Sequence, residues 1–526
     1  MRILLLWFFV CGFCNAASAQ HYNNYGMPGL IDMPVASSAP DAELAFSLSH
    51  IAGQTRGTAT FQLSDRISAS LRYAQLQGLR DPRGTQHDQV FDRSFGLHYR
   101  LLDETARRPA IAIGVNDFIG TGVYAGEYVV ATKSMSPQFT ASMGFGWGRL
   151  ASHGGFAQPF GQRPEIAIGE GGAIATHALF RGDVAVFGGL QYQPRDDLAV
   201  ILEYASDTNA VENSDASSRR SPINIGLTYA PRPDLQVSVQ YLNGEDLGLN
   251  ASYAYQPKQA LARAPQPPTT GSQWQIKPYL VPNFFDPDAP LRADFGVALA
   301  GQMELTPKVV VAAELRQRLI GNLDQTTRQS DSVLPHVRSD FAKYGREGDL
   351  DINRLTVAWQ ANPRRDVTTR LTIGLLEEMY AGVSAEMLWR RPDLPVAVGI
   401  ELNALQQRGY HSDFGLRDYQ VLSGHGSIYW DAGGGYHVQL DAGRYLAGDW
   451  GGTLSLSRRF ENGWSLGAFA TLTDVSFSDF GEGSFDKGIM FTIPLGERGA
   501  LSQTIRPVTR DGGARVHVDG RLYEVR

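Results

Sequence analysis

Residues 235–241 read Leu-Gln-Val-Ser-Val-Gln-Tyr, and this short stretch indicates the fold of the whole chain. Apolar side chains occupy every second position, and glutamine or serine fills the positions between them. A strict alternation with a period of two places the apolar side chains on one face of a β-strand and the polar side chains on the other. We therefore expect a half-buried strand here.

The same alternation recurs along most of the chain. It is clear in 67–73, where Ser68, Ser70 and Arg72 alternate with apolar residues, and in 354–360 and 453–459. Similar stretches lie near 42–50, 58–64, 93–101, 109–116, 126–133, 138–147, 183–192, 197–204, 222–230, 292–301, 308–316, 368–375, 396–402, 436–443, 464–472 and 487–495. Turn signals such as Asn243-Gly244, a strong hairpin signal, separate them. The sequence predicts a long antiparallel all-β meander.

The first residues of the chain have the pattern of a secretory signal peptide. Arg2 precedes an apolar run over 3–13, and Ala17-Ser18-Ala19 matches a small-x-small cleavage site. Cys11 and Cys14 have the C-x-x-C spacing of a redox motif, but they lie inside the apolar run. We expect cleavage near Ala19, which leaves a mature chain without cysteine, and we do not expect lipidation.

The composition of the 526 residues excludes several classes of protein. With 43% hydrophobic and 19% charged residues, the chain is too apolar and too weakly charged for a disordered protein. Two cysteines do not make a disulfide scaffold. A mean hydropathy of −0.21 does not fit repeated helical membrane spans. A formal net charge of −7 does not indicate nucleic-acid binding.

Four features favour membrane barrels over a soluble β-protein. The signal peptide directs the chain to the cell envelope. The stretches approach the roughly 9–11 residues that cross a bilayer at a tilt. Aromatic residues stand at strand ends, as in the interfacial girdles of barrels, and the second face of each strand carries Ser, Thr, Gln and Arg. At about 20 residues per strand and connection, the chain holds roughly two dozen strands.

A segment rich in proline and glutamine, 256–273, interrupts the alternation and has the composition of a linker. We therefore predict two antiparallel transmembrane β-barrels in one chain, of roughly 10–13 strands each. The expected parts are a signal peptide at 1–19, a barrel at 20–255, the linker at 256–273, a barrel at 274–495 and a periplasmic tail at 496–526. Within the tail, Val516–Leu522 reads as a small hairpin. One large barrel of about 22–26 strands is the alternative.

We find no catalytic, cofactor-binding or metal-binding motif. Gly144–Gly148 is glycine-rich but continues a strand, so a barrel bend explains it better than nucleotide binding. Asp286, Asp288 and Asp294 lack the ligand spacing of a calcium loop and are expected to be solvated acids. The 11 histidines form no metal-type pair. Glu377 and Glu378 are a carboxylate pair, but neighbouring strand residues point to opposite faces, which excludes joint glycosidase work.

Arginine and the longer loops are the remaining candidates for function. Of the 47 basic residues, 41 are arginine, which would suit a lumen that holds an anionic polymer, but genome composition and internal salt bridges to the 54 acids are the favoured explanation. The stretches 77–91, 149–172, 205–221 and 320–350 read as loops, and we expect any plug or recognition element among them.

Several stretches together resemble the YjbH-type family of exopolysaccharide outer-membrane proteins. They are Tyr25–Pro34, Asp92–Leu102, Gly114–Lys133, Gly144–Leu150, Gly443–Gly451 and Gly481–Gly488. The resemblance implies a Gram-negative outer-membrane β-barrel involved in exopolysaccharide or capsule production, and it carries no catalytic residues. The chain departs from many such barrels by ending at Arg526 rather than on an aromatic residue.

The expected function is passive, as a translocation or assembly component for a secreted polysaccharide, and not enzymatic. Expected partners are outer-membrane lipid, the polysaccharide and export proteins of the same pathway, with no nucleic acid and no cofactor. Two alternatives stay open. They are a general diffusion porin made of one large barrel, and a soluble periplasmic β-rich scaffold or carbohydrate-binding protein.

Overall fold

A computed structural model describes residues 21–80, 86–164, 176–209, 220–260, 272–285, 289, 291–327, 330–348, 350–481, 484–494, 500–506 and 510–523. The chain divides into two compact units, and the boundary falls between Leu261 and Ala262, inside the expected linker. The expected signal peptide, with Cys11 and Cys14, lies outside the described residues.

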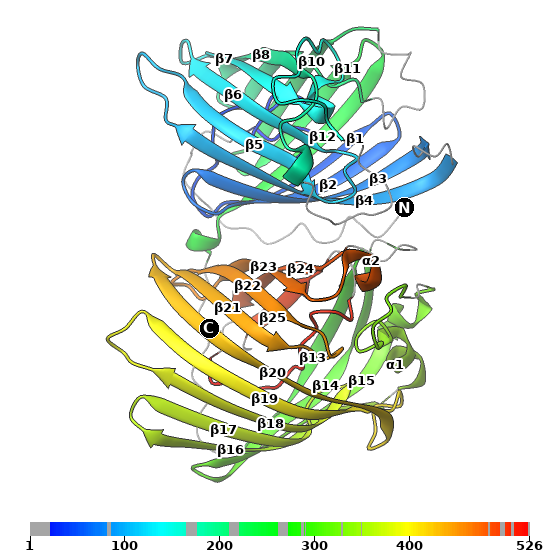
Figure 1. Cartoon of the computed structure of the whole chain (residues 1–526). Helices are drawn as coiled ribbons and strands as arrows, with labels where there is room; N and C mark the ends of the chain where they lie inside the picture. The colour runs from blue at the N-terminus through cyan, green and yellow to red at the C-terminus, as the bar shows by residue number, and fades with distance from the viewer. Residues whose placement is uncertain are drawn as a thin grey trace. The chain divides into compact units, whose positions relative to one another are not determined.

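Unit 1 is a closed barrel of twelve antiparallel strands in sequence order, with β1 paired to β12 (Figure 1). The strands are β1 (Leu44–Ile51), β2 (Gln54–Gln62), β3 (Ile67–Arg80), β4 (Gln86–Leu102), β5 (Ala110–Ile119), β6 (Gly126–Ser134), β7 (Phe139–Trp147), β8 (Val184–Arg195), β9 (Leu198–Tyr204), β10 (Ile223–Arg232), β11 (Leu235–Leu242) and β12 (Asp246–Tyr255).

Unit 2 is a nearly closed barrel of thirteen antiparallel strands, with β13 and β25 at its edges (Figure 1). The strands are β13 (Gln273–Phe284), β14 (Leu291–Thr306), β15 (Val309–Gly321), β16 (Leu350–Arg364), β17 (Val367–Leu375), β18 (Tyr380–Arg390), β19 (Val396–Arg408), β20 (Leu416–Gly433), β21 (Tyr436–Arg444), β22 (Trp450–Arg459), β23 (Ser465–Thr473), β24 (Asp486–Pro494) and β25 (Ala500–Ile505). The all-β fold with two barrels is confirmed, and the single large barrel is wrong.

The two faces of the strands are reversed relative to a soluble β-protein. In β11 the polar residues Gln236, Ser238 and Gln240 are buried toward the lumen. The apolar residues between them face outward, and Val239 is 52% exposed. In β1, Ser47 is likewise buried while the leucine that follows it is exposed. An apolar outer surface around a polar interior is the pattern of membrane barrels.

The connections of unit 1 are short at one end and long at the other. Turns at the short end cover 63–66, 103–109, 135–138, 196–197 and 233–234. Connections at the opposite end, called here the long-loop end, cover 52–53, 81–85, 120–125, 148–183, 205–222 and 243–245. This asymmetry is also typical of outer-membrane barrels, which have short periplasmic turns and longer external loops.

Helical structure is minor. The elements are η1 (Gly148–Ala151), η2 (Thr176–Ala178), η3 (Pro257–Gln259), η4 (Leu323–Gln325), α1 (Phe341–Glu347) and α2 (Phe477–Phe480). Within the described ranges, none of these helices has the length and apolar character needed for a membrane crossing.

Three expectations about element boundaries are wrong. The second barrel does not end at 495, because β25 pairs with β24 through Ala500↔Pro494. The stretch 77–91 is not a separate loop, since β3 and β4 extend through most of it as a long hairpin. The tail residues 516–522 form no hairpin and lie in irregular structure.

Candidate functional site

Residues 21–36, called here the N-terminal plug, fill the lumen of unit 1. Every residue from His21 to Ala36 is buried, although the segment forms no strand of the barrel. It continues through 37–43 into β1. Two isolated bridges, Tyr22↔Pro28 and Gly29↔Pro34, fold the segment back on itself. The plug is therefore a compact loop held by the inward-facing side chains of the barrel wall.

Glu203 of β9 is the central anchor of the N-terminal plug. Its carboxylate accepts hydrogen bonds from the backbone N–H groups of Ile31 (2.8 Å), Asp32 (2.9 Å) and Met33 (2.9 Å). The side-chain amide of Asn224 on β10 donates a fourth, at 2.9 Å. A carboxylate that accepts several N–H groups in a buried site forms strong, charge-assisted hydrogen bonds. One side chain of the wall thus fixes the turn of the plug.

Aromatic and arginine side chains hold the plug near the long-loop end. Tyr25 of the plug meets Tyr124 edge-on, with ring centroids 5.9 Å apart. Three guanidinium groups lie over these rings, and that of Arg72 is 4.2 Å from the Tyr124 centroid. The other two belong to Arg56 and Arg149. Cation–π contacts of this kind gain strength when they are desolvated, as they are here.

Polar contacts also fold the plug on itself and join it to the barrel wall. His21 Nδ1 donates to the Gly29 carbonyl at 2.7 Å, and its Nε2 lies 3.0 Å from the Thr228 hydroxyl. The amide of Asn24 donates to Gln240 at 2.8 Å. The two wall partners, Thr228 and Gln240, belong to the polar inward face that the alternation predicts. Serine, threonine and glutamine of the lumen therefore serve as hydrogen-bonding partners for the plug.

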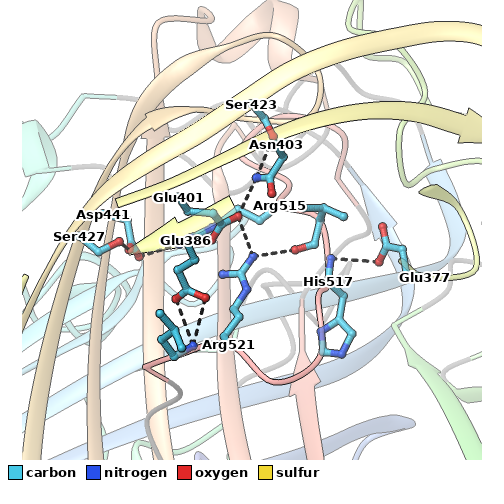
Figure 2. Close-up of polar contacts among 12 residues, drawn as sticks. Glu377, Glu386, Glu401, Asn403, Ser423, Ser427, Asp441, Arg515, His517 and Arg521 are labelled. Carbon is cyan, nitrogen blue, oxygen red and sulfur yellow. Dashed lines mark hydrogen bonds and ion pairs between the residues drawn. The ribbon is translucent and has the colours of Figure 1, made fainter. Parts of the chain in front are cut away.

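The lumen of unit 2 is occupied by the other end of the chain, residues 510–523, called here the C-terminal tail. Arg515 lies 3.1 Å from Glu401 of β19 and 3.0 Å from Asp441 of β21. Arg521 lies 3.1 Å from the second oxygen of Glu401 (Figure 2). Removing one member of such a buried pair is costly, because it leaves the other charge unpaired.

The C-terminal tail follows the lumen over most of its length. Beyond Arg515, the backbone N–H of Leu522 donates to Glu386 at 3.0 Å. Asp519 pairs with Arg354, and its carbonyl accepts from Arg370 at 2.7 Å. Tyr523 stacks on Tyr429 near the short-turn end of β20, with centroids 3.9 Å apart.

The connection between β15 and β16 covers the tail where it enters the lumen. Asp511 accepts hydrogen bonds from the backbone N–H groups of Arg338 (2.8 Å) and Ser339 (3.0 Å). Val516 and Val518 of the tail pack in a buried apolar cluster with Tyr344 of α1. The expected hairpin is replaced by this packing, because the apolar valines find buried partners inside the barrel.

Asp340, the residue before α1, contacts polar side chains from the connections of unit 2 and from the start of β20. It accepts from the Tyr410 hydroxyl at 2.7 Å and pairs with Lys343 at 2.9 Å. His336 and Arg417 lie farther away, at 3.4 and 3.8 Å. Burial raises the pKa of Asp340, but the hydrogen bonds from Tyr410 and Lys343 outweigh it and lower that pKa below its ordinary value.

Two of the acids weighed in the sequence, Glu377 and Asp294, have structural partners. Glu377 accepts from Arg338 at 2.7 Å and from the backbone N–H of His517 at 3.1 Å. Glu377 and Glu378 lie in the turn between β17 and β18, so the expectation that they are strand residues is wrong. Asp294 lies 3.6 Å from Arg318. Asp286 and Asp288 lie outside the described residues.

Gly144 to Trp147 continue β7, and Gly148 begins η1. Within the described parts of the chain, no group of three or more His, Cys, Asp and Glu side chains is placed to hold a metal ion. Each lumen is a polar interior occupied by one segment of the chain, residues 21–36 in unit 1 and residues 510–523 in unit 2.

The comparison that decides the family covers both units. A family model described as an exopolysaccharide biosynthesis protein matches residues 21–272 and 263–526. The chain belongs to the YjbH exopolysaccharide biosynthesis family. The resemblance seen in the sequence is confirmed.

A relative within the YjbH family is the protein described as an uncharacterized lipoprotein, YjbH, of Escherichia coli K12. The two are 24% identical, and the match covers 96% of this chain and 94% of the relative. Among solved structures, the FrpB iron transporter of Neisseria meningitidis aligns over 90% of this chain and 79% of its own, with 8% identity and a TM-score of 0.20. The ferric-catecholate receptor Fiu of E. coli gives the same identity and TM-score, over 90% and 81%. Scores this low support no argument about this YjbH-family chain.

Sequence reasoning missed both closing segments. Plugs were expected in the loops, but the described parts of the lumens are occupied by residues 21–36 and 510–523. One signal pointed to the first of them, since the family-like stretch Tyr25–Pro34 is the plug itself. It has no periodicity, so it fits neither a strand nor a helix.

Proposed function

We propose that this protein is an outer-membrane β-barrel protein that takes part in exopolysaccharide or capsule production, as a passive translocation or assembly component. One observation carries the proposal. Each barrel has an apolar outer face and a polar lumen, and the lumen is occupied by a segment of the chain that hydrogen bonds and ion pairs hold in place.

The outward side chains support a location in lipid. Leu48, Leu190, Val239 and Ile225 are all about half exposed on the outer face of unit 1, and Leu402 and Ile373 are their counterparts in unit 2. A soluble scaffold would expose this continuous apolar surface to water, which soluble monomers avoid. In unit 1 the strands close into a ring, which pairs their backbone groups as hydrocarbon requires. The soluble periplasmic alternative is therefore disfavoured.

The side chains of the lumens favour passage or guidance of a polymer over catalysis. Their buried side chains are hydroxyls, amides, arginines and carboxylates, which match the hydrogen-bonding groups of a hydrated polysaccharide. The acids that might act in catalysis are held by plug or tail, as Glu203 and Glu401 are. We propose that the protein is not an enzyme and that energy for export comes from other proteins of the pathway.

The closed lumens also distinguish the proposal from a diffusion porin. A general porin keeps a water-filled channel open, whereas these barrels are filled by buried segments. The partners that we propose are outer-membrane lipid, the polysaccharide and export proteins of the same pathway. Movement of a plug or tail would be the event that such a partner controls.

Deletion of the gene in the producing bacterium tests the proposal. We expect extracellular polysaccharide to fall in amount or to be retained in the periplasm, and the intact gene to restore it. A variant such as Asp393→Asn, in an exposed turn, should restore it equally and serves as the control. Unchanged amount and location of the polysaccharide in the deletion strain would refute the proposal. Membrane fractionation with heat-modifiable gel mobility checks the location separately.

A further inference from the structure

A cleft of about 530 Å³ lies at the long-loop end of unit 1. Three connections form it, and its lining comes from 122–125, from 148–164 and 182–183 of one long connection, and from 207–208. Clefts of this size fall within the usual range for small-ligand sites, about 300–1,000 Å³. It is separate from the contacts of Glu203 that hold the plug, although it shares Arg149 and Asp207 with the cluster around Tyr25.

The lining of this cleft is polar and electrically balanced. Gln158, Gln162 and Thr208 present amide and hydroxyl groups. Two arginines, Arg149 and Arg163, are matched by two acids, Asp183 and Asp207, so the formal charges of the lining cancel.

Both arginines of the cleft are already engaged. Arg149 pairs with Asp207, and Arg163 donates to both oxygens of Glu127 at 2.7 and 3.0 Å. An acidic ligand would have to displace one of these carboxylates. A ligand rich in hydroxyl groups and without charge can instead hydrogen-bond to the amide of Gln162 and to the amide oxygen of Gln158, whose NH₂ group also donates to Asp183 at 2.8 Å.

Hydrogen bonds hold the backbone of the connections that form the cleft. Glu127 is buried and also accepts the backbone N–H of Phe180 at 2.9 Å, which ties two parts of the long connection to β6. The N–H of Gly182 donates to the carbonyl of Gly161 at 2.8 Å. Gly148 has φ +60°, and a Cβ there would lie 2.7 Å from the Ala125 carbonyl. Sites whose walls are held in advance lose less entropy on binding.

We propose that this cleft binds a short stretch of uncharged, hydroxyl-rich polysaccharide at the long-loop end of unit 1. The inference rests on the proposed function, because it names where the polymer would touch the protein. Gln158 and Gln162 are the residues that we assign to the contact. They line the cleft from an exposed loop and do not hold the plug.

Oligosaccharides made by partial hydrolysis of the strain's own exopolysaccharide provide the probe. Their binding to the purified full chain in detergent is measured by titration calorimetry. The double variant Gln158→Ala, Gln162→Ala should bind about 30-fold more weakly, since it loses two hydrogen bonds that contribute about 1 kcal/mol each. Gln138→Ala, in the turn 135–138 at the short end, is the matched control and should bind as the native chain does. Heat-modifiable mobility shows that each variant is folded.

Absence of binding by the native chain, or equal binding by the double variant, overturns the inference. Oligosaccharides whose carboxyl groups have been reduced to alcohols should bind at least as well as the untreated ones. Loss of binding after reduction would show that an acidic group is recognised and would also overturn it. These outcomes are distinct from failure of the proposed function, which is a deletion strain with normal extracellular polysaccharide.

Discussion

Arg515 lies 3.1 Å from Glu401, so a residue near the end of the chain is paired with the wall of its own barrel. The pair joins segments 114 residues apart. Both side chains are largely buried, and Asp441 completes the site on the other side of the guanidinium at 3.0 Å. The C-terminal tail is therefore docked by specific charges, and this makes its release measurable.

Arg515→Gln should loosen the tail. Removing one partner of a buried ion pair costs about 3 kcal/mol, which corresponds to about a 100-fold loss of amide protection. Hydrogen exchange over 510–523 measures it. Arg391→Gln breaks an exposed pair with Asp393 and should leave this protection unchanged. Equal protection in the native chain and in Arg515→Gln would contradict the assignment of the pair as an anchor.

Removal of the tail should open unit 2. A stop codon at Arg510 takes away the segment that pairs with Glu401, Asp441 and Glu386 and leaves β25 intact. In planar bilayers, we expect this variant to show larger and more frequent conductance steps than the full chain. Identical conductance would mean that the tail does not limit passage through the lumen.

Two substitutions of Glu203 should loosen the N-terminal plug to different extents. Glu203→Ala leaves three backbone N–H groups, those of Ile31, Asp32 and Met33, without their acceptor, at a cost of about 3 kcal/mol or more. Glu203→Gln keeps one oxygen and should cost less. Protease cleavage within 21–36 should rise strongly in the first variant and weakly in the second. Cleavage at equal rates in both would show that the carboxylate oxygens are not the anchor.

Acid should loosen α1 through Asp340. Its pKa is lowered in the folded protein, so its ionised form stabilises the fold, and this stabilisation is present above the ordinary pKa of an aspartate. It is lost as pH falls through the lowered value, that is, below about pH 4. Hydrogen exchange over 341–347 should show greater protection in the native chain than in Asp340→Asn at pH 7. The difference should narrow as the pH falls below the ordinary range of an aspartate, and a difference that stays constant throughout acid titration would contradict this account.

Most strands of the barrels could be predicted because the two faces of a strand follow from the alternation of apolar and polar residues within it. The stretch 235–241 alternates in this way, and β11 has the expected faces. Five strands were missed, namely β12, β13, β18, β20 and β25. For two of them the reason is identifiable. In β20, glycines stand at outward positions and interrupt the apolar series. In β13, Pro278 and Pro282 argue against a strand, but an edge strand can accommodate proline on its unpaired side.

The positions of the N-terminal plug and the C-terminal tail could not be predicted from local sequence patterns. Residues 31–33 are fixed by Glu203, about 170 residues away along the chain, and no spacing records that contact. In the tail, Val516-His517-Val518 alternates as a strand would, yet its valines are buried against α1 and the wall. Long-range polar partners decide both segments. The same limit applies to the cleft, whose lining comes from three connections.

Each closing segment is covalently joined to a strand of its own barrel. The N-terminal plug reaches β1 through 37–43, and the tail follows β25 with few residues between. A plug that leaves its lumen is therefore held at a high effective concentration by its tether, as in any intramolecular binding event. Resealing does not depend on how much protein the membrane contains. A polymer in transit would compete with a segment that cannot diffuse away, so closure would follow passage without any separate stopper protein.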